Sequence, residues 1–154
     1  MGRKNSPSAN KELNELIAQY ETARAENRQL YLDGDQLADI ADQYAAGRKF
    51  NEAQEVITYG LHLHPDSTDL LVEQAYLYLD TGKIPLAKKV VESITDEYDT
   101  DVKMLKAELM LNEGQLENAR NVLDTIEDAD ELETIINIVY LYMDMGYPLS
   151  LIHI

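Results

Sequence analysis

Glycine recurs at a fixed interval in this chain of 154 residues, because Gly82, Gly114 and Gly146 lie 32 residues apart. Alanine recurs in the same phase, at intervals of 34 and then 32 residues: Ala53, Ala87 and Ala119. A period in this range is typical of one helical hairpin used repeatedly, in which each copy buries its apolar face against the next. We therefore expect an all-α chain built by stacking.

Aligning the copies on these alanines places the same residue types at equivalent positions. The small residues are Ala41, Ala75 and Ala107 in the first helix of each copy and Ala53, Ala87 and Ala119 in the second. The aromatic residues near the end of the first helix are Tyr44, Tyr78 and Tyr142. Small residues let two helix backbones approach closely, and tyrosine fills the space beside them. Pro65 ends a helix and sets the direction of the chain after it.

This pattern resembles the tetratricopeptide repeat family of the bacterial type, whose 34-residue unit is a pair of helices. The resemblance implies a right-handed α-solenoid of stacked antiparallel helix pairs. It places three repeats and the first helix of a truncated fourth as follows: 33–67, 68–99, 100–131 and 132–148.

Some positions depart from the family pattern. The first copy has its turn glycine at Gly47, one position early. Lys103 and Lys106 stand where the family usually has apolar residues. The match is therefore specific for the fold and weak for the function.

The N-terminal segment precedes the first full repeat. Residues 1–10 are polar and are expected to be disordered. Apolar residues then recur at helical spacing, and Asn10 fits an N-cap. We expect a capping helix over residues 11–32, running from about Lys11 toward Arg28, that covers the apolar side of the first repeat. A partner-binding helix is the alternative.

Charge and composition limit the kinds of partner that this chain is expected to bind. The formal net charge is -16, which repels phosphate backbones and anionic lipid headgroups and so argues against nucleic-acid or membrane binding. A basic or neutral partner is easier to accommodate, although the charge can equally serve solubility alone. The sequence contains no cysteine and no secretory signal. No apolar stretch approaches the length of about 20 residues that a membrane span requires. We expect a cytoplasmic protein.

The chain ends on the string LSLIHI, which resembles the start of a translated sequencing-adapter read-through. We expect residues 149–154 to be non-native and the natural protein to be longer; a short apolar tail that docks on the last helix is the alternative. Without a second helix in the fourth repeat, Ile135, Ile138 and Tyr142 would be poorly covered. An exposed apolar edge that can self-associate is expected there.

The resemblance also implies a concave groove lined by the first helices of successive repeats. The residues expected to line it and bind a partner are Asp42, Val72, Tyr76, Leu79, Met104, Glu108, Leu111, Ile136, Tyr140 and Met143. Carboxylates mixed with apolar and aromatic groups suit a peptide that bears basic and apolar residues. The alternative is that Val72, Met104, Leu111 and Ile136 simply pack against adjacent helices.

Family members that hold chaperone C-termini grip the terminal carboxylate with lysine, arginine and asparagine. Here Asp42, Glu108 and Asp144 stand on those faces. An acidic-tailed chaperone partner is therefore not expected.

Catalytic patterns are scarce. His62 and His64 lie two residues apart, and residues at this spacing on a helix do not face each other, so a role at the helix C-terminus is favoured over metal binding. No phosphate-binding glycine loop or nucleophile turn is present. We expect a protein-binding scaffold that is not an enzyme and needs no cofactor or metal. A self-assembling structural module and the recruiting arm of a longer enzyme are the alternatives.

Overall fold

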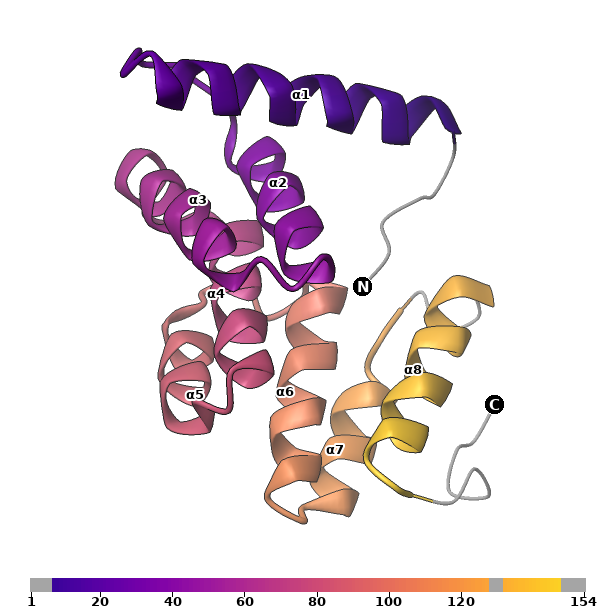
Figure 1. The fold of residues 1–154 in the computed structure, drawn as a ribbon. Helices are drawn as coiled ribbons and strands as arrows, with labels where there is room; N and C mark the ends of the chain where they lie inside the picture. Colours follow the sequence, from indigo (N-terminus) through magenta and orange to yellow (C-terminus); the bar gives the residue numbers. More distant parts are fainter. Residues whose placement is uncertain (1–6, 128–131, 148–154) are drawn as a thin grey trace. The chain divides into compact units, whose positions relative to one another are not determined.

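A computed structural model describes residues 7–127 and 132–147 of the chain. These residues form eight helices and no strand, so the expected all-α class is confirmed. The helices are α1 (Pro7–Ala25), α2 (Gly34–Ala46), α3 (Phe50–Leu63), α4 (Thr68–Asp80), α5 (Ile84–Ser93), α6 (Thr100–Asn112), α7 (Leu116–Leu123) and α8 (Leu132–Asp144) (Figure 1). The expectations for residues 1–6 and 149–154 lie outside the described residues.

The chain divides into two compact units, an N-terminal unit over Met1–Gly82 and a C-terminal unit over Lys83–Ile154. The division falls between α4 and α5, and therefore inside the repeat expected over 68–99. Helix α4 packs against α2 and α3, whereas α5 packs against α6. Each unit thus combines helices from neighbouring expected repeats, which is how stacked hairpins share their cores.

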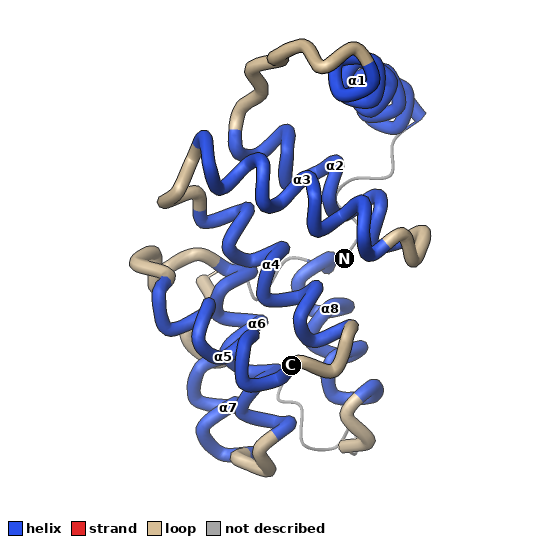
Figure 2. Tube along the Cα trace, turned by 60° about the vertical axis from the view of Figure 1, so that its left-hand side comes forward, coloured by secondary structure: helices blue, strands red, loops and turns tan. Residues whose placement is uncertain are grey.

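The core of the N-terminal unit forms where α2, α3 and α4 meet (Figure 2). Helices α2 and α3 are joined by a short turn and run antiparallel. At Gly60 of α3, an added Cβ would lie 2.8 Å from Cδ1 of Leu70 and 3.4 Å from Cδ1 of Leu37. Leucine side chains of α4 and α2 therefore pack directly on the backbone of α3, in the space that a Cβ would fill.

The aligned alanines occupy equivalent buried positions, as expected. Ala41 is 1% exposed, and the remaining five alanines are 0% exposed: Ala53, Ala75, Ala87, Ala107 and Ala119. Tyr44 and Tyr142 are buried beside them, and Tyr78 is half-buried. The periodicity therefore marks the places where helices touch.

Helix α1 begins earlier than expected. It starts at Pro7, so the expectation of disorder is wrong for residues 7–10, and Asn10 lies inside the helix without capping it. Proline suits the first helical position because an N–H there would have no partner within the helix, so the N–H that proline lacks is not missed, and because its φ is already helical. The helix ends at Ala25, short of Arg28, and Asn27 adopts a left-handed φ of 52° that breaks the helix.

Helix α1 packs on the N-terminal unit through one face. Tyr20 and Ala23 are buried, and the rings of Tyr20 and Tyr59 lie 6.3 Å apart. The Tyr44 hydroxyl donates a hydrogen bond of 2.6 Å to Oε1 of Glu21. Apolar packing, to which Leu13, Leu16 and Ile17 also contribute, and this hydrogen bond therefore attach α1 to the α2–α3 hairpin.

The turn between the two helices of a pair uses a left-handed residue. Gly82, Gly114 and Gly146 have φ of 74°, 75° and 75°. In the first pair this conformation belongs to Arg48, with φ of 58°, and Gly47 has an ordinary φ of -82°. The expectation that Gly47 is the displaced turn glycine was wrong, because the backbone keeps its register and only the residue type changes.

The core of the C-terminal unit brings together side chains of α6, α7 and α8. Its buried members include Met104, Ala107, Leu111, Ala119, Leu123, Leu141 and Tyr142. Lys103 is also buried, 9% exposed, and its Nζ donates a hydrogen bond of 2.8 Å to the Thr125 carbonyl just beyond α7. Lysine replaces an apolar residue here because its stem packs like one while its ammonium group reaches a carbonyl at a helix C-terminus.

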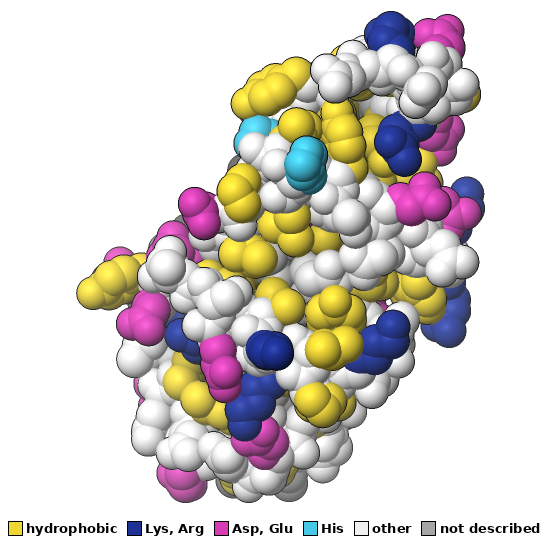
Figure 3. All heavy atoms as spheres, turned by 90° about the vertical axis from the view of Figure 1, so that its left-hand side faces the viewer, with side chains coloured by type: hydrophobic (Ala, Val, Ile, Leu, Met, Phe, Trp, Pro, Cys, Tyr) yellow, Lys and Arg dark blue, Asp and Glu magenta, His cyan; other side chains and the backbone are white. Residues whose placement is uncertain are grey.

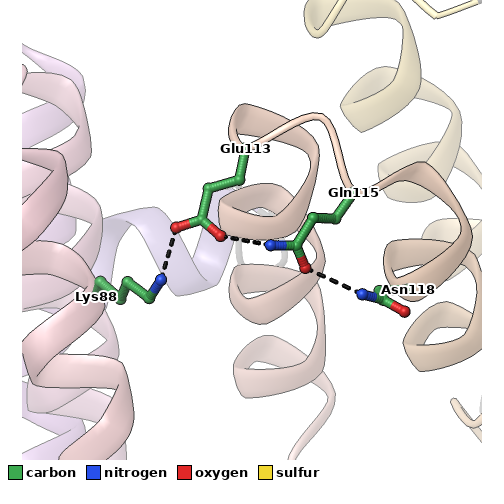
Figure 4. Close-up of polar contacts among 4 residues, drawn as sticks. All are labelled: Lys88, Glu113, Gln115 and Asn118. Carbon is green, nitrogen blue, oxygen red and sulfur yellow. Dashed lines mark hydrogen bonds and ion pairs between the residues drawn. The ribbon is translucent and has the colours of Figure 1, made fainter.

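A polar chain joins α5 to the turn between α6 and α7 (Figure 4). Nζ of Lys88 lies 2.7 Å from Oε1 of Glu113. Nε2 of Gln115 donates to Oε2 of Glu113 at 2.8 Å, and Nδ2 of Asn118 donates to Oε1 of Gln115 at 3.0 Å. The hydrogen bond and the charge of Glu113 raise the pKa of Lys88, as expected for an ammonium group beside a carboxylate.

The turn conformations predict opposite responses to alanine at adjacent positions. At position 48, glycine should give a free energy of unfolding about 1 kcal/mol higher than alanine, because a left-handed φ strains a residue with a Cβ. At position 47, the free energy of unfolding should be about 0.5 kcal/mol higher with alanine than with glycine. Alanine restricts the unfolded chain, and its Cβ would come no closer than 3.6 Å to other atoms of the folded protein.

Urea unfolding of Gly47→Ala, Arg48→Gly and Arg48→Ala, followed by circular dichroism, measures both differences. The comparison at position 48 is made between the two variants because both lose the contact of the Arg48 guanidinium with the Phe50 ring, at 5.5 Å. If Gly47→Ala destabilised the protein, or if Arg48→Ala were as stable as Arg48→Gly, the assignment of the left-handed position to Arg48 would be contradicted.

The buried tyrosines predict a loss of stability at alkaline pH. Burial, together with the hydrogen bond to Glu21, raises the pKa of Tyr44 above its usual 10.0, and burial raises the pKa of Tyr20. The folded state keeps these protons where the unfolded state releases them. The stabilisation is therefore complete below pH 10 and is lost as the pH rises further.

The free energy of urea unfolding, measured on both sides of pH 10, should fall less steeply with pH for Tyr44→Phe than for the wild type. Tyr98→Phe is the matched control because Tyr98 is 87% exposed, and its slope should equal that of the wild type. Equal slopes for all three proteins would show that Tyr44 does not contribute.

Candidate interaction surface

The ten residues expected to bind a partner belong to both compact units. The first helices of the three expected repeats are α2, α4 and α6. They contribute seven of the ten residues: Asp42, Val72, Tyr76, Leu79, Met104, Glu108 and Leu111. Helix α8 contributes Ile136, Tyr140 and Met143. Helices α2 and α4 lie in the N-terminal unit, and α6 and α8 lie in the C-terminal unit.

Three of the expected contact residues are part of the core. Val72, Met104 and Leu111 are 5%, 3% and 3% exposed, so the expectation that they line an accessible groove was wrong and the packing alternative is confirmed. Helix α6 contacts α5 and α7, and its buried residues lie all around its circumference. A helix inside a stack is covered on several sides, so no apolar stripe of α6 remains for a ligand.

Helix α8 presents an apolar stripe to solvent. Ile136, Tyr140 and Met143 are 42%, 59% and 53% exposed. Their spacing of four and then three residues places them on one face of the helix. Ile136 is therefore accessible and is not buried against an adjacent helix, which was the alternative interpretation. We call these three side chains the α8 stripe.

The residues expected to form an uncovered C-terminal edge are instead packed. Tyr142 is 2% exposed and its ring meets that of Tyr147 edge-on, with centroids 6.4 Å apart. Ile138 packs against the same core, and Ile135 is half-buried. Tyr147 packs onto Tyr142, so the exposed apolar surface described for this helix is the α8 stripe on another of its faces.

The remaining expected contacts are partly accessible. Asp42, Tyr76, Leu79 and Glu108 are all half-buried. Each can present part of its side chain to a partner, while the rest packs on its own unit.

Charge around the α8 stripe is acidic. Asp144 is exposed, lies next to Met143 in sequence and follows Tyr140 by one helical turn. On the face of the molecule drawn in Figure 3, acidic and basic side chains are interspersed without a single-sign patch. The net charge of -16 is therefore not concentrated on that face.

The two histidines at the C-terminal end of α3 have separate environments. His64 caps the helix, and its Nε2 lies 2.8 Å from the Leu32 carbonyl, while its ring meets Tyr31 edge-on. His62 is exposed. His64 therefore ties the segment before α2 to the end of α3. Within residues 7–127 and 132–147, no three acidic or histidine side chains are placed to share a metal ion.

The sequence did not indicate a cavity that lies in the N-terminal unit. It measures about 210 Å³ and is lined by Tyr20, Ala23, Arg24, Asn27, Arg28, Gln29, Leu30 and Tyr59. These residues come from the end of α1, the segment after it and the middle of α3. The only local signal was the placement of Arg24 one helical turn after Tyr20, which says nothing about Tyr59.

In the described part of the chain, no helix is both long and apolar enough to traverse a lipid bilayer.

Comparison with known proteins identifies the repeat. A family model described as tetratricopeptide repeat matches residues 44–109, which run from the end of α2 into α6. No curated protein and no solved structure matches the chain. The matched segment contains four of the aligned alanines, all buried where helices meet: Ala53, Ala75, Ala87 and Ala107. This family match and this packing support a tetratricopeptide-type repeat over residues 44–109.

Proposed function

We propose that this protein binds a protein or peptide partner through a surface that includes the α8 stripe. Tetratricopeptide repeats generally mediate protein–protein interaction and are typically non-catalytic. The specific surface and the chemistry of the partner are inferred from the exposed side chains of this chain.

The exposure of the α8 stripe is the observation that supports the proposal most directly. Three large apolar side chains stand in line on one helix, each more than two-fifths exposed. Contiguous apolar groups in water are unfavourable and commonly mark a binding site. Tyrosine and methionine are also enriched at protein interfaces, because they bury a large area and adapt to the partner.

The partner that fits this surface has apolar and basic side chains. Asp144 beside the stripe and the net charge of -16 attract Lys and Arg. An amphipathic helix with apolar residues at positions i and i+4 matches the spacing of Ile136 and Tyr140. Such a partner would use both the apolar contact and the charge.

Further partner contacts are proposed within each unit taken by itself: Asp42, Tyr76 and Leu79 in the N-terminal unit and Glu108 in the C-terminal unit. Each contributes a partly accessible carboxylate or apolar group. Val72, Met104 and Leu111 contribute to the proposal only by holding α4 and α6 in place, since they are buried.

Substitution of the stripe should weaken binding and leave the fold intact. For Tyr140→Ser with Met143→Ser, we expect affinity for an identified partner to fall at least about tenfold, because central aromatic contacts often contribute more than about 1 kcal/mol each. The partner is first captured with the wild-type protein, identified by mass spectrometry and then titrated by calorimetry. Affinity for a basic partner should also fall as salt is raised.

Leu86→Ser with Tyr98→Ser is the matched control, because these residues are 44% and 87% exposed in the same unit and lie outside the stripe. Equal loss of binding by both double variants would contradict the assignment to α8. If sedimentation instead shows a wild-type dimer that the stripe variant converts to monomer, the occupant of the stripe is a second copy of the chain and the proposal of a separate partner fails.

A further inference from the structure

Helix α1 is attached to the N-terminal unit through a small part of its length. It lies at the edge of that unit, beside α2 and α3 (Figure 1). Among its residues, only Tyr20 and Ala23 are buried. Leu13, Leu16 and Ile17 pack against the same core but remain half-buried. Burial of apolar surface is what holds a helix on a core, so α1 gains less from docking than α2 or α3 does.

Docking of α1 is also unfavourable at one buried polar atom. The Tyr20 side chain is 5% exposed, and its hydroxyl is shielded from water without a hydrogen-bond partner among the described residues. A phenol hydroxyl that is buried in this way loses the hydrogen bonds that it makes in water. It regains them when α1 leaves the core. Tyrosine at position 20 therefore favours the undocked helix more than phenylalanine would.

The polar contacts of α1 oppose its release only weakly. The Tyr44 hydroxyl donates a hydrogen bond to Oε1 of Glu21. The Arg24 guanidinium lies 5.8 Å from the centroid of the Tyr59 ring. Glu21 and Arg24 are both exposed. Contacts of this kind contribute little net stability, because water replaces them when they break.

The chain that follows α1 contains a pivot. Residues 26–29 are all exposed. The Tyr59 hydroxyl donates a hydrogen bond of 2.8 Å to the Leu30 carbonyl. Nε2 of His64 lies 2.8 Å from the Leu32 carbonyl oxygen. The segment before α2 is thus anchored to the end of α3, and it can stay in place while α1 turns about residues 26–29.

We propose that α1 is a displaceable cap, which opens as a unit and uncovers a second binding surface on α2 and α3. The uncovered side chains include Tyr44 and the ring of Tyr59. The partner that fits this surface is an amphipathic helix with the apolar spacing of α1 and a carboxylate in place of Glu21. With phenylalanine in place of Tyr20, such a helix would dock without an unpaired hydroxyl and would displace α1. This surface belongs to the N-terminal unit, whereas the α8 stripe belongs to the C-terminal unit.

Hydrogen exchange of the full chain, followed by nuclear magnetic resonance, tests whether α1 opens by itself. Amides in the middle of α1 should exchange through one shared opening that is more frequent than the unfolding of α2 and α3. This opening should depend more weakly on urea, because it exposes less surface. Equal protection and equal urea dependence for α1 and α2 would overturn the proposal.

Gln74→Ala separates the opening of α1 from the unfolding of the whole unit. Gln74 is 6% exposed on α4 and exchanges two hydrogen bonds with Gln54 of α3. These bonds persist when α1 leaves. Exchange in α2, α3 and α4 should therefore become at least about fivefold faster, while exchange in α1 should change by less than about twofold. Equal acceleration in α1 would show that α1 leaves only when the unit unfolds.

A peptide of residues 7–28 probes the uncovered surface of the full chain. Tyr20→Phe in the protein should weaken peptide binding at least about fivefold, because the protein's own α1 then docks more firmly. The same substitution in the peptide should strengthen binding by a similar factor, because the docked peptide then buries no unpaired hydroxyl. Effects of the same sign would overturn the proposal. So would a substituted peptide that fails to shift the resonance signals of Tyr44 and Tyr59 at its solubility limit.

Tyr31→Phe is the matched control, because it removes a tyrosine hydroxyl from the same unit where the side chain is 71% exposed. Exchange in α1 and affinity for the peptide should stay within about twofold of the wild type. A change as large as that of Tyr20→Phe would show that burial at α1 is not the cause. If sedimentation shows a dimer that the added peptide converts to monomer, the occupant is α1 of a second copy and the proposal of a separate partner fails.

Discussion

Close approach of helix backbones at small residues is the constraint on which the rest of this structure depends. Six aligned alanines are at most 1% exposed, and at Gly60 even one added carbon would come within 2.8 Å of Leu70. Larger side chains at these positions would separate the helices and open voids between them, and a core loses both transfer and packing energy when that happens. The tyrosines and leucines beside the alanines can then fill the remaining space.

Stacking also decides which apolar groups stay exposed. Helix α6 has neighbours on several sides, so Met104 and Leu111 are covered even though their positions match a binding face. Helix α8 is covered through Leu141 and Tyr142 and leaves the α8 stripe in water. The same residue types therefore serve the core in one helix and a proposed interface in the next, and the difference comes from their neighbours.

Polar residues resolve several local conflicts in the stack. Arg48 adopts the left-handed turn that glycine fills in the later copies. Lys103 satisfies a carbonyl beyond α7 from inside the core, and Gln74, 6% exposed, exchanges two hydrogen bonds with Gln54 between α3 and α4.

The helical class, the pairing of helices and the burial of the alanines could be predicted from residue spacing, because each hairpin repeats the same contacts at the same interval. Spacing also placed Ile136, Tyr140 and Met143 on one face of a helix. The burial of Val72, Met104 and Leu111, the transfer of the turn conformation from Gly47 to Arg48 and the cavity beside Tyr20 could not be predicted. Exposure, backbone strain and enclosed space depend on which side chains arrive from other helices, and only the packed chain brings Tyr59 to Tyr20 across 39 residues of sequence.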